Sequence, residues 1–265
     1  MRASFSKAEI ESAISSRFGS AFQLHEKRPA ELISTGIPQI DSFILGGLPR
    51  GAITEIFGPA SSGRTSFMFS AMAHATGHEE VCALVDTNNA FDPKSATRAE
   101  INCERLLWIR CANNLEHAFK ATDLLLQGGG FGLVLLDLGD VPANSAKRII
   151  SSWWYRFRRT LEPTPTALVV IAEESCVRSC AALALELSGE ACLWSSSEGP
   201  GSSRSSSSRS LLPLSTPAAV DALRRPVNRS SLPHSTLLNG LSFQVQCQRP
   251  LYLNRRVGEV LVKAG

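Results

Sequence analysis

The stretch Gly58-Pro59-Ala60-Ser61-Ser62-Gly63-Arg64-Thr65-Ser66 decides the fold of this chain. Its two glycines stand five residues apart and are followed by a basic residue and a hydroxyl. This is the spacing of a phosphate-binding loop (P-loop), except that the usual lysine is replaced by Arg64. Glycines let such a loop curl around a phosphate, whose charge is attracted by backbone N–H groups and the following helix N-terminus. All nine residues are therefore candidate nucleotide-binding residues. A glycine-rich turn without a ligand is the alternative.

The sequence on both sides of the loop fits this interpretation. Residues 52–57 are rich in β-branched and aromatic side chains and predict a strand. Residues 65–75 contain no Gly or Pro and end before Gly77, which predicts a helix. Further on, short apolar runs alternate with helical stretches, which predicts an α/β fold with a mostly parallel central sheet and helices on both faces. The expected strands are residues 81–86, 106–111, 133–137 and 167–172, and the expected helices are residues 93–100, 115–127 and 145–161.

Composition narrows the class of protein. The 265 residues are 43% hydrophobic and carry a formal net charge of only +3, which suits a globular protein and excludes a strongly basic nucleic-acid binder. The seven cysteines lack the paired spacing of a disulfide framework or a zinc site. No apolar run reaches the length of a membrane span, and the N-terminus has no signal-peptide core. We therefore expect a cytoplasmic protein without a membrane segment.

The N-terminal part of the chain divides in two. Residues 1–30 contain the capping-box pattern Ser6-Lys7-Ala8-Glu9 and predict a helical extension. This helix packs either on its own core or on a second copy, so a homo-oligomer is a candidate assembly. Residues 31–194 are expected to form the nucleotide-binding core.

The C-terminal part of the chain also divides in two. Residues 195–235 are rich in serine and predict a flexible linker, because they carry too little apolar surface to fold alone. Residues 236–265 contain two stretches with strand character, 241–248 and 256–263. We expect this strand pair to pack back on the core and complete the sheet.

A longer pattern around the loop resembles the bacterial RecA recombinase family. It includes Ser34-Thr35-Gly36, Gly46-Gly47-Leu48-Pro49 and the proline at the second position of the P-loop. The pattern then extends as far as Asp137, over about half of the chain. Its further segments are Leu84-Val85-Asp86, Ala90-Phe91-Asp92-Pro93, Leu106-Leu107 and residues 116–127. The resemblance implies a RecA-like P-loop NTPase core that uses ATP and Mg²⁺.

The implied ATP site is altered at two positions. Thr65 and the strand-end Asp137 are the expected Mg²⁺ ligands, and Asp137 is also a candidate nucleotide-binding residue. Asn88 stands two residues after Asp86, where the family carries its catalytic glutamate, and an amide does not titrate near neutral pH. Arg64 keeps the charge of the missing lysine but not its shape. General-base and charge-stabilising groups each contribute about two to four orders of magnitude in rate. We therefore expect weak or absent hydrolysis and assign no residue as catalytic.

The DNA-facing features of the family are reduced. Few residues separate Asp137 from the next helix, and Glu173-Glu174 stand where the family usually carries an amide-bearing switch residue. Residues 147–159 mix basic and aromatic side chains that could contact single-stranded DNA or a partner protein. The candidate contact residues are Arg148, Arg156 and Arg159. The alternative is an ordinary amphipathic helix whose core-facing stripe is Ile149, Trp153, Phe157 and Leu161.

Within the family the chain most resembles the ImuA-type RecA paralogues, which are associated with the SOS response, damage-induced mutagenesis and translesion synthesis. That resemblance implies an accessory protein of DNA repair that binds ATP with weak or no hydrolysis. The implied partners are RecA itself and translesion polymerase components, with single-stranded DNA as a further candidate. Two alternatives stay open. One is an active DNA-dependent ATPase and recombinase; the other is an adaptor resembling SulA-type division inhibitors, which bind protein rather than nucleotide.

Overall fold

The structure, a computed structural model, describes most of the chain from Glu31 onward. The chain separates into two units, residues 1–30 and 31–265, and all described residues belong to the second. The predicted N-terminal helix therefore lies outside the described residues, as do most of the predicted serine-rich linker and Arg148. The described residues are 31–147, 149, 151–194, 212–213, 238–249 and 259–264.

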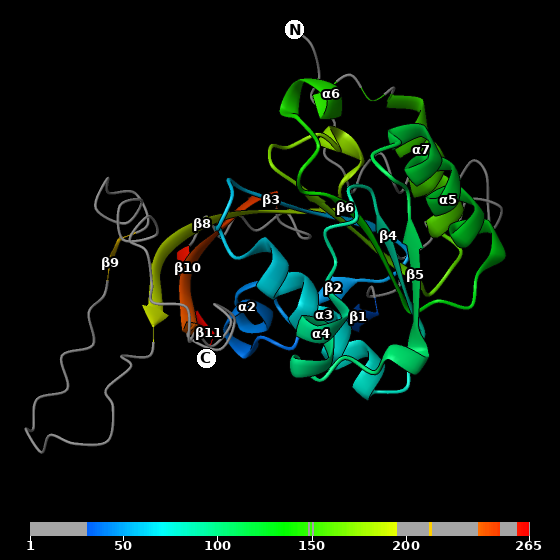
Figure 1. The fold of residues 1–265 in the computed structure, drawn as a ribbon. Helices are drawn as coiled ribbons and strands as arrows, with labels where there is room; N and C mark the ends of the chain where they lie inside the picture. The colour runs from blue at the N-terminus through cyan, green and yellow to red at the C-terminus, as the bar shows by residue number, and fades with distance from the viewer. Residues whose placement is uncertain are drawn as a thin grey trace, which may run out of the picture. The chain divides into compact units, whose positions relative to one another are not determined.

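The described part of the chain forms a nine-stranded sheet with the P-loop strand near its middle (Figure 1). The strand order is β11-β10-β8-β3-β7-β6-β4-β5, and the short β9 pairs with β8 beside this path. The strands from β8 to β5 in this order run parallel, whereas β10 pairs antiparallel with both β8 and β11. Two short strands form a separate antiparallel sheet, β1 (Leu32–Ile33) and β2 (Leu48–Pro49). The strands of the large sheet are β3 (Ile53–Phe57), β4 (Cys82–Asp86), β5 (Leu106–Arg110), β6 (Leu133–Leu138), β7 (Ala167–Ala172), β8 (Leu183–Trp194), β9 (Leu212–Pro213), β10 (Leu238–Arg249) and β11 (Glu259–Ala264).

Helices cover both faces of this sheet, so the predicted α/β fold is confirmed (Figure 1). One face carries α2 (Pro38–Phe43), α3 (Arg64–Gly77) and α4 (Pro93–Arg98). The other carries α5 (Leu115–Gly128), α6 (Ala143–Lys147) and α7 (Ser151–Leu161). The C-terminal strands β10 and β11 extend the sheet beyond β8, as the sequence predicted.

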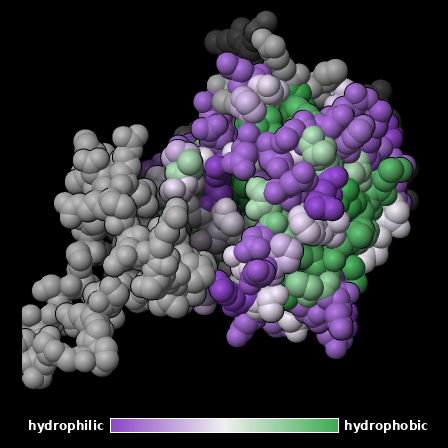
Figure 2. All heavy atoms as spheres, viewed as in Figure 1, coloured by the Kyte–Doolittle hydropathy of each residue, from purple (hydrophilic) through white to green (hydrophobic). Residues whose placement is uncertain are grey.

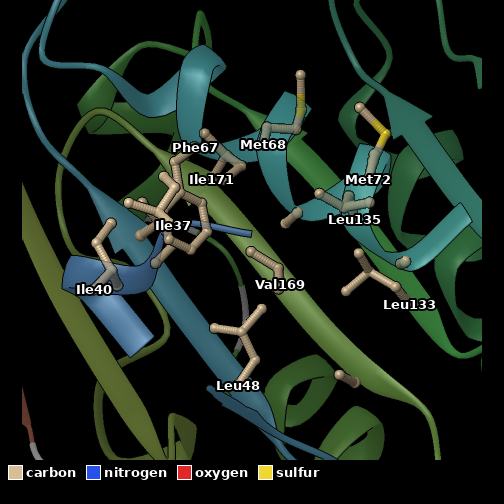
Figure 3. Close-up of a cluster of buried hydrophobic side chains, with 14 of the residues drawn as sticks. Ile37, Ile40, Leu48, Phe67, Met68, Met72, Leu133, Leu135, Val169 and Ile171 are labelled. Atoms are coloured by element: carbon tan, nitrogen blue, oxygen red, sulfur yellow. The ribbon is translucent and has the colours of Figure 1, made fainter. Parts of the chain in front are cut away.

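Alternate residues of the central strands contribute to the two hydrophobic cores. In β6, Leu133 and Leu135 belong to the core beneath α3, which Figure 3 shows together with Phe67 of that helix. Val134 and Leu136 belong to the core on the opposite face. Because both faces are buried, the central strands are apolar at nearly every position. This is why the sequences of these strands are continuously apolar and do not alternate between apolar and polar residues.

One local prediction was wrong, and one strand was missed. The helix expected over residues 145–161 is two helices, α6 and α7, that are separated before Ser151. Serine is a weak former of helix interiors and is common at helix starts, which favours a new helix at Ser151-Ser152. The strand β8 was not predicted from the sequence. Its residues include Gly189 in the interior, and its extended conformation depends on pairing with β3 on one side and β10 on the other.

The surface of the described residues mixes polar and apolar side chains. In Figure 2 hydrophobic residues show among hydrophilic ones toward the side where β5 and α5 lie. Leu107 of the edge strand β5 is 44% exposed and Leu124 of α5 is 69% exposed. Among the described residues, no helix has both the length and the apolar character needed to cross a membrane.

Candidate nucleotide-binding site

The P-loop lies at the carboxyl end of β3, where ligands of parallel sheets usually bind. The strand ends at Phe57, residues 58–63 form the loop, and α3 begins at Arg64. The backbone N–H of Gly58 donates to the carbonyls of Ala172 (3.3 Å) and Glu173 (3.2 Å), which ties the start of the loop to the end of β7. The predicted order of strand, loop and helix is therefore present.

Two glycines of the loop lie against neighbouring strands. A methyl group built on Gly58 would lie 2.0 Å from the carbonyl oxygen of Leu187 in β8. One built on Gly63 would lie 2.8 Å from the ring of Phe243 in β10, and Gly63 also has a φ of +97°. Residues other than glycine rarely adopt a φ in this range. Position 63 therefore requires glycine both for its backbone conformation and for its packing against Phe243. The C-terminal strand thus supports the P-loop from one side.

The hydroxyl-bearing residues of the loop differ in exposure. Ser61 and Thr65 are exposed, and Ser66 is half-buried. Pro59 and Ala60, at the outer positions of the loop, are also exposed. Ser62 is buried, and its Oγ has no hydrogen-bond partner among the described residues. The first N–H groups of α3 lack partners within the helix and are the donors from which a phosphate would accept hydrogen bonds.

Arg64 extends from the start of α3 toward the end of β6. Its Nη1 donates to the carbonyl oxygen of Gly139 at 3.2 Å. The N–H of Gly139 in turn donates to Oδ1 of Asp137 at 2.8 Å. A methyl group built on Gly139 would lie 3.0 Å from Asp137 Oδ1 and 3.6 Å from Arg64 Nη1, so the two side chains flank the same α-carbon.

The electrostatics of Asp137 reflect these neighbours. Desolvation at the end of β6 raises the pKa of Asp137 to about 6, and the nearby carboxylates of Asp86 and Asp140 act in the same direction. The N–H of Gly139 and the Arg64 guanidinium act in the opposite direction. Asp137 is therefore mainly ionised at neutral pH and available to a cation.

Asp86 is the last residue of β4, the strand that pairs with β6, and Asn88 follows it in the next turn. Nδ2 of Asn88 donates to Oδ1 of Asn113 at 3.0 Å, and Oδ1 of Asn88 is buried without a partner among the described residues. Asp86 is 1% exposed and accepts bonds from the N–H groups of Ala90 (3.0 Å) and Phe91 (3.1 Å). Asp86 therefore closes a turn, and the Asn88 amide cannot act as a general base at the candidate site.

The connection between β7 and β8, residues 173–182, is short and is held to the sheet by Glu55. This carboxylate of β3 is 0% exposed and accepts bonds from Ser175 Oγ (2.8 Å) and from the N–H groups of Cys176 and Val177. Beside the loop lies a hollow of about 390 Å³ that carries several carboxylates, which disfavour a phosphate there. It is lined by Phe57, Gly58, Pro59, Glu173, Glu174, Ser175 and Glu186.

The structure describes two of the three predicted contact arginines. Arg156 donates hydrogen bonds from two nitrogens to the carboxylate of Asp123 in α5. Asp123 is only 7% exposed. Arg159 is exposed. In α7, Phe157 and Leu161 are 0% exposed, so this helix carries the core-facing stripe of the amphipathic alternative. The predicted Trp153 and Ile149 are half-buried and pack against the same core, and the neighbouring Trp154, at 2% exposed, is a further core residue of this helix.

The residues at the loop have the chemical groups that would bind the phosphates of a nucleotide and its Mg²⁺ ion. The cradle has the glycines and the helix N-terminus that phosphates need. Thr65 and Asp137 supply the oxygen donors that Mg²⁺ prefers. The Arg64 guanidinium, however, lies beside Asp137, so a cation of the chain already shares the surroundings of the expected metal ligand.

Comparison with known proteins decides the family. A profile of the RecA N-terminal domain matches residues 7–149, just over half of the chain. The chain belongs to the RecA family. It is 29% identical over 161 residues to Protein RecA of Leifsonia xyli subsp. xyli, over 55% of this chain and 45% of that protein. It is 36% identical over 114 residues to Protein RecA of Pseudomonas putida, over 43% of this chain and 32% of that protein. The chain thus spans less than half of the length of these RecA relatives.

Three residues of this RecA-family site were missed by the sequence analysis. Gly139 joins Arg64 to Asp137, Phe243 packs against the P-loop, and Glu55 anchors the connection after β7. A glutamate inside an otherwise apolar strand is an unusual pattern and was a usable signal for Glu55. The other two depend on contacts between distant segments, which local sequence patterns do not encode.

Proposed function

We propose that this RecA-family chain is an accessory protein of DNA repair that binds ATP at its P-loop and hydrolyses it weakly or not at all. One observation carries this proposal. The side chains at the positions of the P-loop lysine and the catalytic glutamate, Arg64 and Asn88, are both bonded to protein groups, while the backbone cradle keeps its glycines and its helix.

The chemistry of these two side chains supports binding over turnover. Hydrolysis needs a group that orients or deprotonates the attacking water, and an asparagine amide has no useful basicity near neutral pH. A guanidinium can hold phosphate oxygens, but its planar fork does not replace the compact ammonium of lysine in a tight loop. Backbone N–H groups are unaffected by both replacements, so nucleotide affinity is retained.

The proposal extends to damage-induced mutagenesis with the ImuA-type paralogues as the functional comparison. Its partners would be RecA and translesion polymerase components. The short connections after β6 and β7 support a role through protein partners, because they leave little chain for contact with DNA. The charge of Arg156 is neutralised by Asp123, so single-stranded DNA is the weaker of the candidate partners.

Calorimetric titration with ATP and Mg²⁺, followed by phosphate-release assays with and without single-stranded DNA, tests the proposal. We expect binding with turnover that DNA does not stimulate. The double variant Arg64→Lys/Asn88→Glu should release phosphate faster by about tenfold or more, since it restores both missing groups. Rapid DNA-stimulated turnover in the wild type would instead identify an active recombinase. Absence of nucleotide binding would favour the adaptor.

A further inference from the structure

The Arg64 guanidinium lies where it could have a different role from that of a P-loop lysine. A P-loop lysine is a point charge that contacts the phosphates directly. Here Nη1 reaches past the loop to the carbonyl of Gly139, one residue beyond the end of β6. The guanidinium therefore stands between the phosphate cradle and the strand end that carries Asp137.

This placement brings together the groups that a metal ion would normally join. Asp137 and Arg64 flank the α-carbon of Gly139, and Thr65 follows Arg64 directly in the chain. A guanidinium has five N–H donors in a planar fork. The one hydrogen bond described for Arg64 uses only Nη1, so the remaining donors of the fork are available for phosphate oxygens.

We infer that Arg64 is the built-in cation of this site, so that the chain binds nucleotide without needing Mg²⁺. The inference rests on the proposed nucleotide-binding function and concerns how that site neutralises phosphate charge. Arginine binds phosphate through short charge-assisted hydrogen bonds and keeps its charge at all physiological pH values. A divalent ion placed at Thr65 and Asp137 would meet the same guanidinium, and like charges repel. Mg²⁺ should therefore add little to the affinity.

Titration of the full chain with ADP, in Mg²⁺ and in EDTA, measures this requirement without any contribution from hydrolysis. We expect the Kd of the wild type to differ by less than about threefold between the two conditions. Arg64→Gln keeps a polar side chain but removes the charge, so its Kd should rise by at least about tenfold in EDTA. Lys120→Gln removes an exposed cation of α5, on the opposite face of the sheet from α3, and is the matched control, with the wild-type ratio expected.

Mn²⁺ binding, followed by electron paramagnetic resonance in the presence of ADP, gives a second readout on the same proteins. Mn²⁺ prefers the same oxygen ligands as Mg²⁺. The ADP complex of Arg64→Gln should bind Mn²⁺ at least about tenfold more tightly than the ADP complex of the wild type, because the Arg64 guanidinium no longer repels the ion. A role of Arg64 in folding alone would not produce this gain.

The outcomes separate this inference from the proposed function. Wild-type binding that collapses in EDTA overturns the inference and leaves nucleotide binding intact. Equal Mn²⁺ affinity in the wild type and Arg64→Gln also overturns it. Failure to bind ADP under both conditions overturns the proposed function and the inference together. A metal-independent wild type with a metal-dependent Arg64→Gln variant supports both.

Discussion

At the residue scale, the P-loop depends on the absence of a side chain at Gly63. The residue precedes α3 with a φ of +97°, and its α-carbon lies against the ring of Phe243. The two constraints are independent, since one is a backbone conformation and the other is a packing contact. A glycine motif recognised from spacing alone indicates the first constraint, but only the fold reveals the second.

Gly63→Ala should therefore lower the free energy of unfolding by about 2–4 kcal/mol. Alanine is strained at a positive φ, and its methyl group would clash with the ring of Phe243. Gly77→Ala is the matched control. Gly77 is the last residue of α3 and a methyl group there meets no atom within 4 Å, so this change should stabilise the helix by about 0.5–1 kcal/mol. Urea denaturation measures both. Equal effects of the two substitutions would contradict the contact with Phe243.

At the element scale, Glu55 joins the P-loop strand to the connection between β7 and β8. Its carboxylate accepts two backbone N–H groups and one hydroxyl within the core. Buried donors without acceptors are costly, so this one side chain fixes the path of residues 173–182. The same connection also contributes the carbonyl of Glu173 that holds Gly58. Glu55 therefore supports the loop through a neighbouring element.

Glu55→Ala should cost about 3–5 kcal/mol of stability, because two N–H groups are left buried and unpaired beside a cavity. Glu55→Gln keeps an oxygen acceptor and most of the volume, and it should recover more than half of that loss. Chemical denaturation of both variants gives the comparison. If Glu55→Ala unfolds within about 1 kcal/mol of the wild type, Glu55 does not anchor the connection.

At the scale of the whole molecule, strand β10 returns to pack against the P-loop. The strand β10 pairs along β8 and places Phe243, which is 0% exposed, in the core beneath the P-loop. Residues near the end of the chain thus support a loop formed near its beginning. Both β10 and β11 are therefore strands of the central sheet.

Phe243→Ala should lower the free energy of unfolding by about 3–5 kcal/mol, as expected for a large cavity in a buried core. It should also weaken nucleotide binding, because the cavity lies directly against Gly63. Leu124→Ala is the control: Leu124 is 69% exposed, and its loss should change stability by less than about 0.5 kcal/mol. Denaturation and ADP titration are the measurements. Unchanged nucleotide affinity in a destabilised Phe243→Ala variant would show that β10 supports the fold but not the loop.

The sequence by itself determined the local features of this protein. The P-loop spacing, the continuous apolar strands and the alternation with helices predicted the α/β fold, and the collinear segments up to Asp137 predicted the RecA resemblance, which the family match confirms. These features are local because hydrophobic periodicity and turn residues act over a few positions. The replacements at Arg64 and Asn88 were equally visible, since they follow from spacing alone.

The tertiary structure decided the features that depend on distant segments. It split the predicted helix of residues 145–161, formed β8 from a sequence with weak strand character, and placed Phe243 against Gly63. It also directed Arg64 to Gly139 beside Asp137. Each of these results comes from contacts between residues far apart in the chain. The sequence shows which groups are present, but packing decides which of them meet.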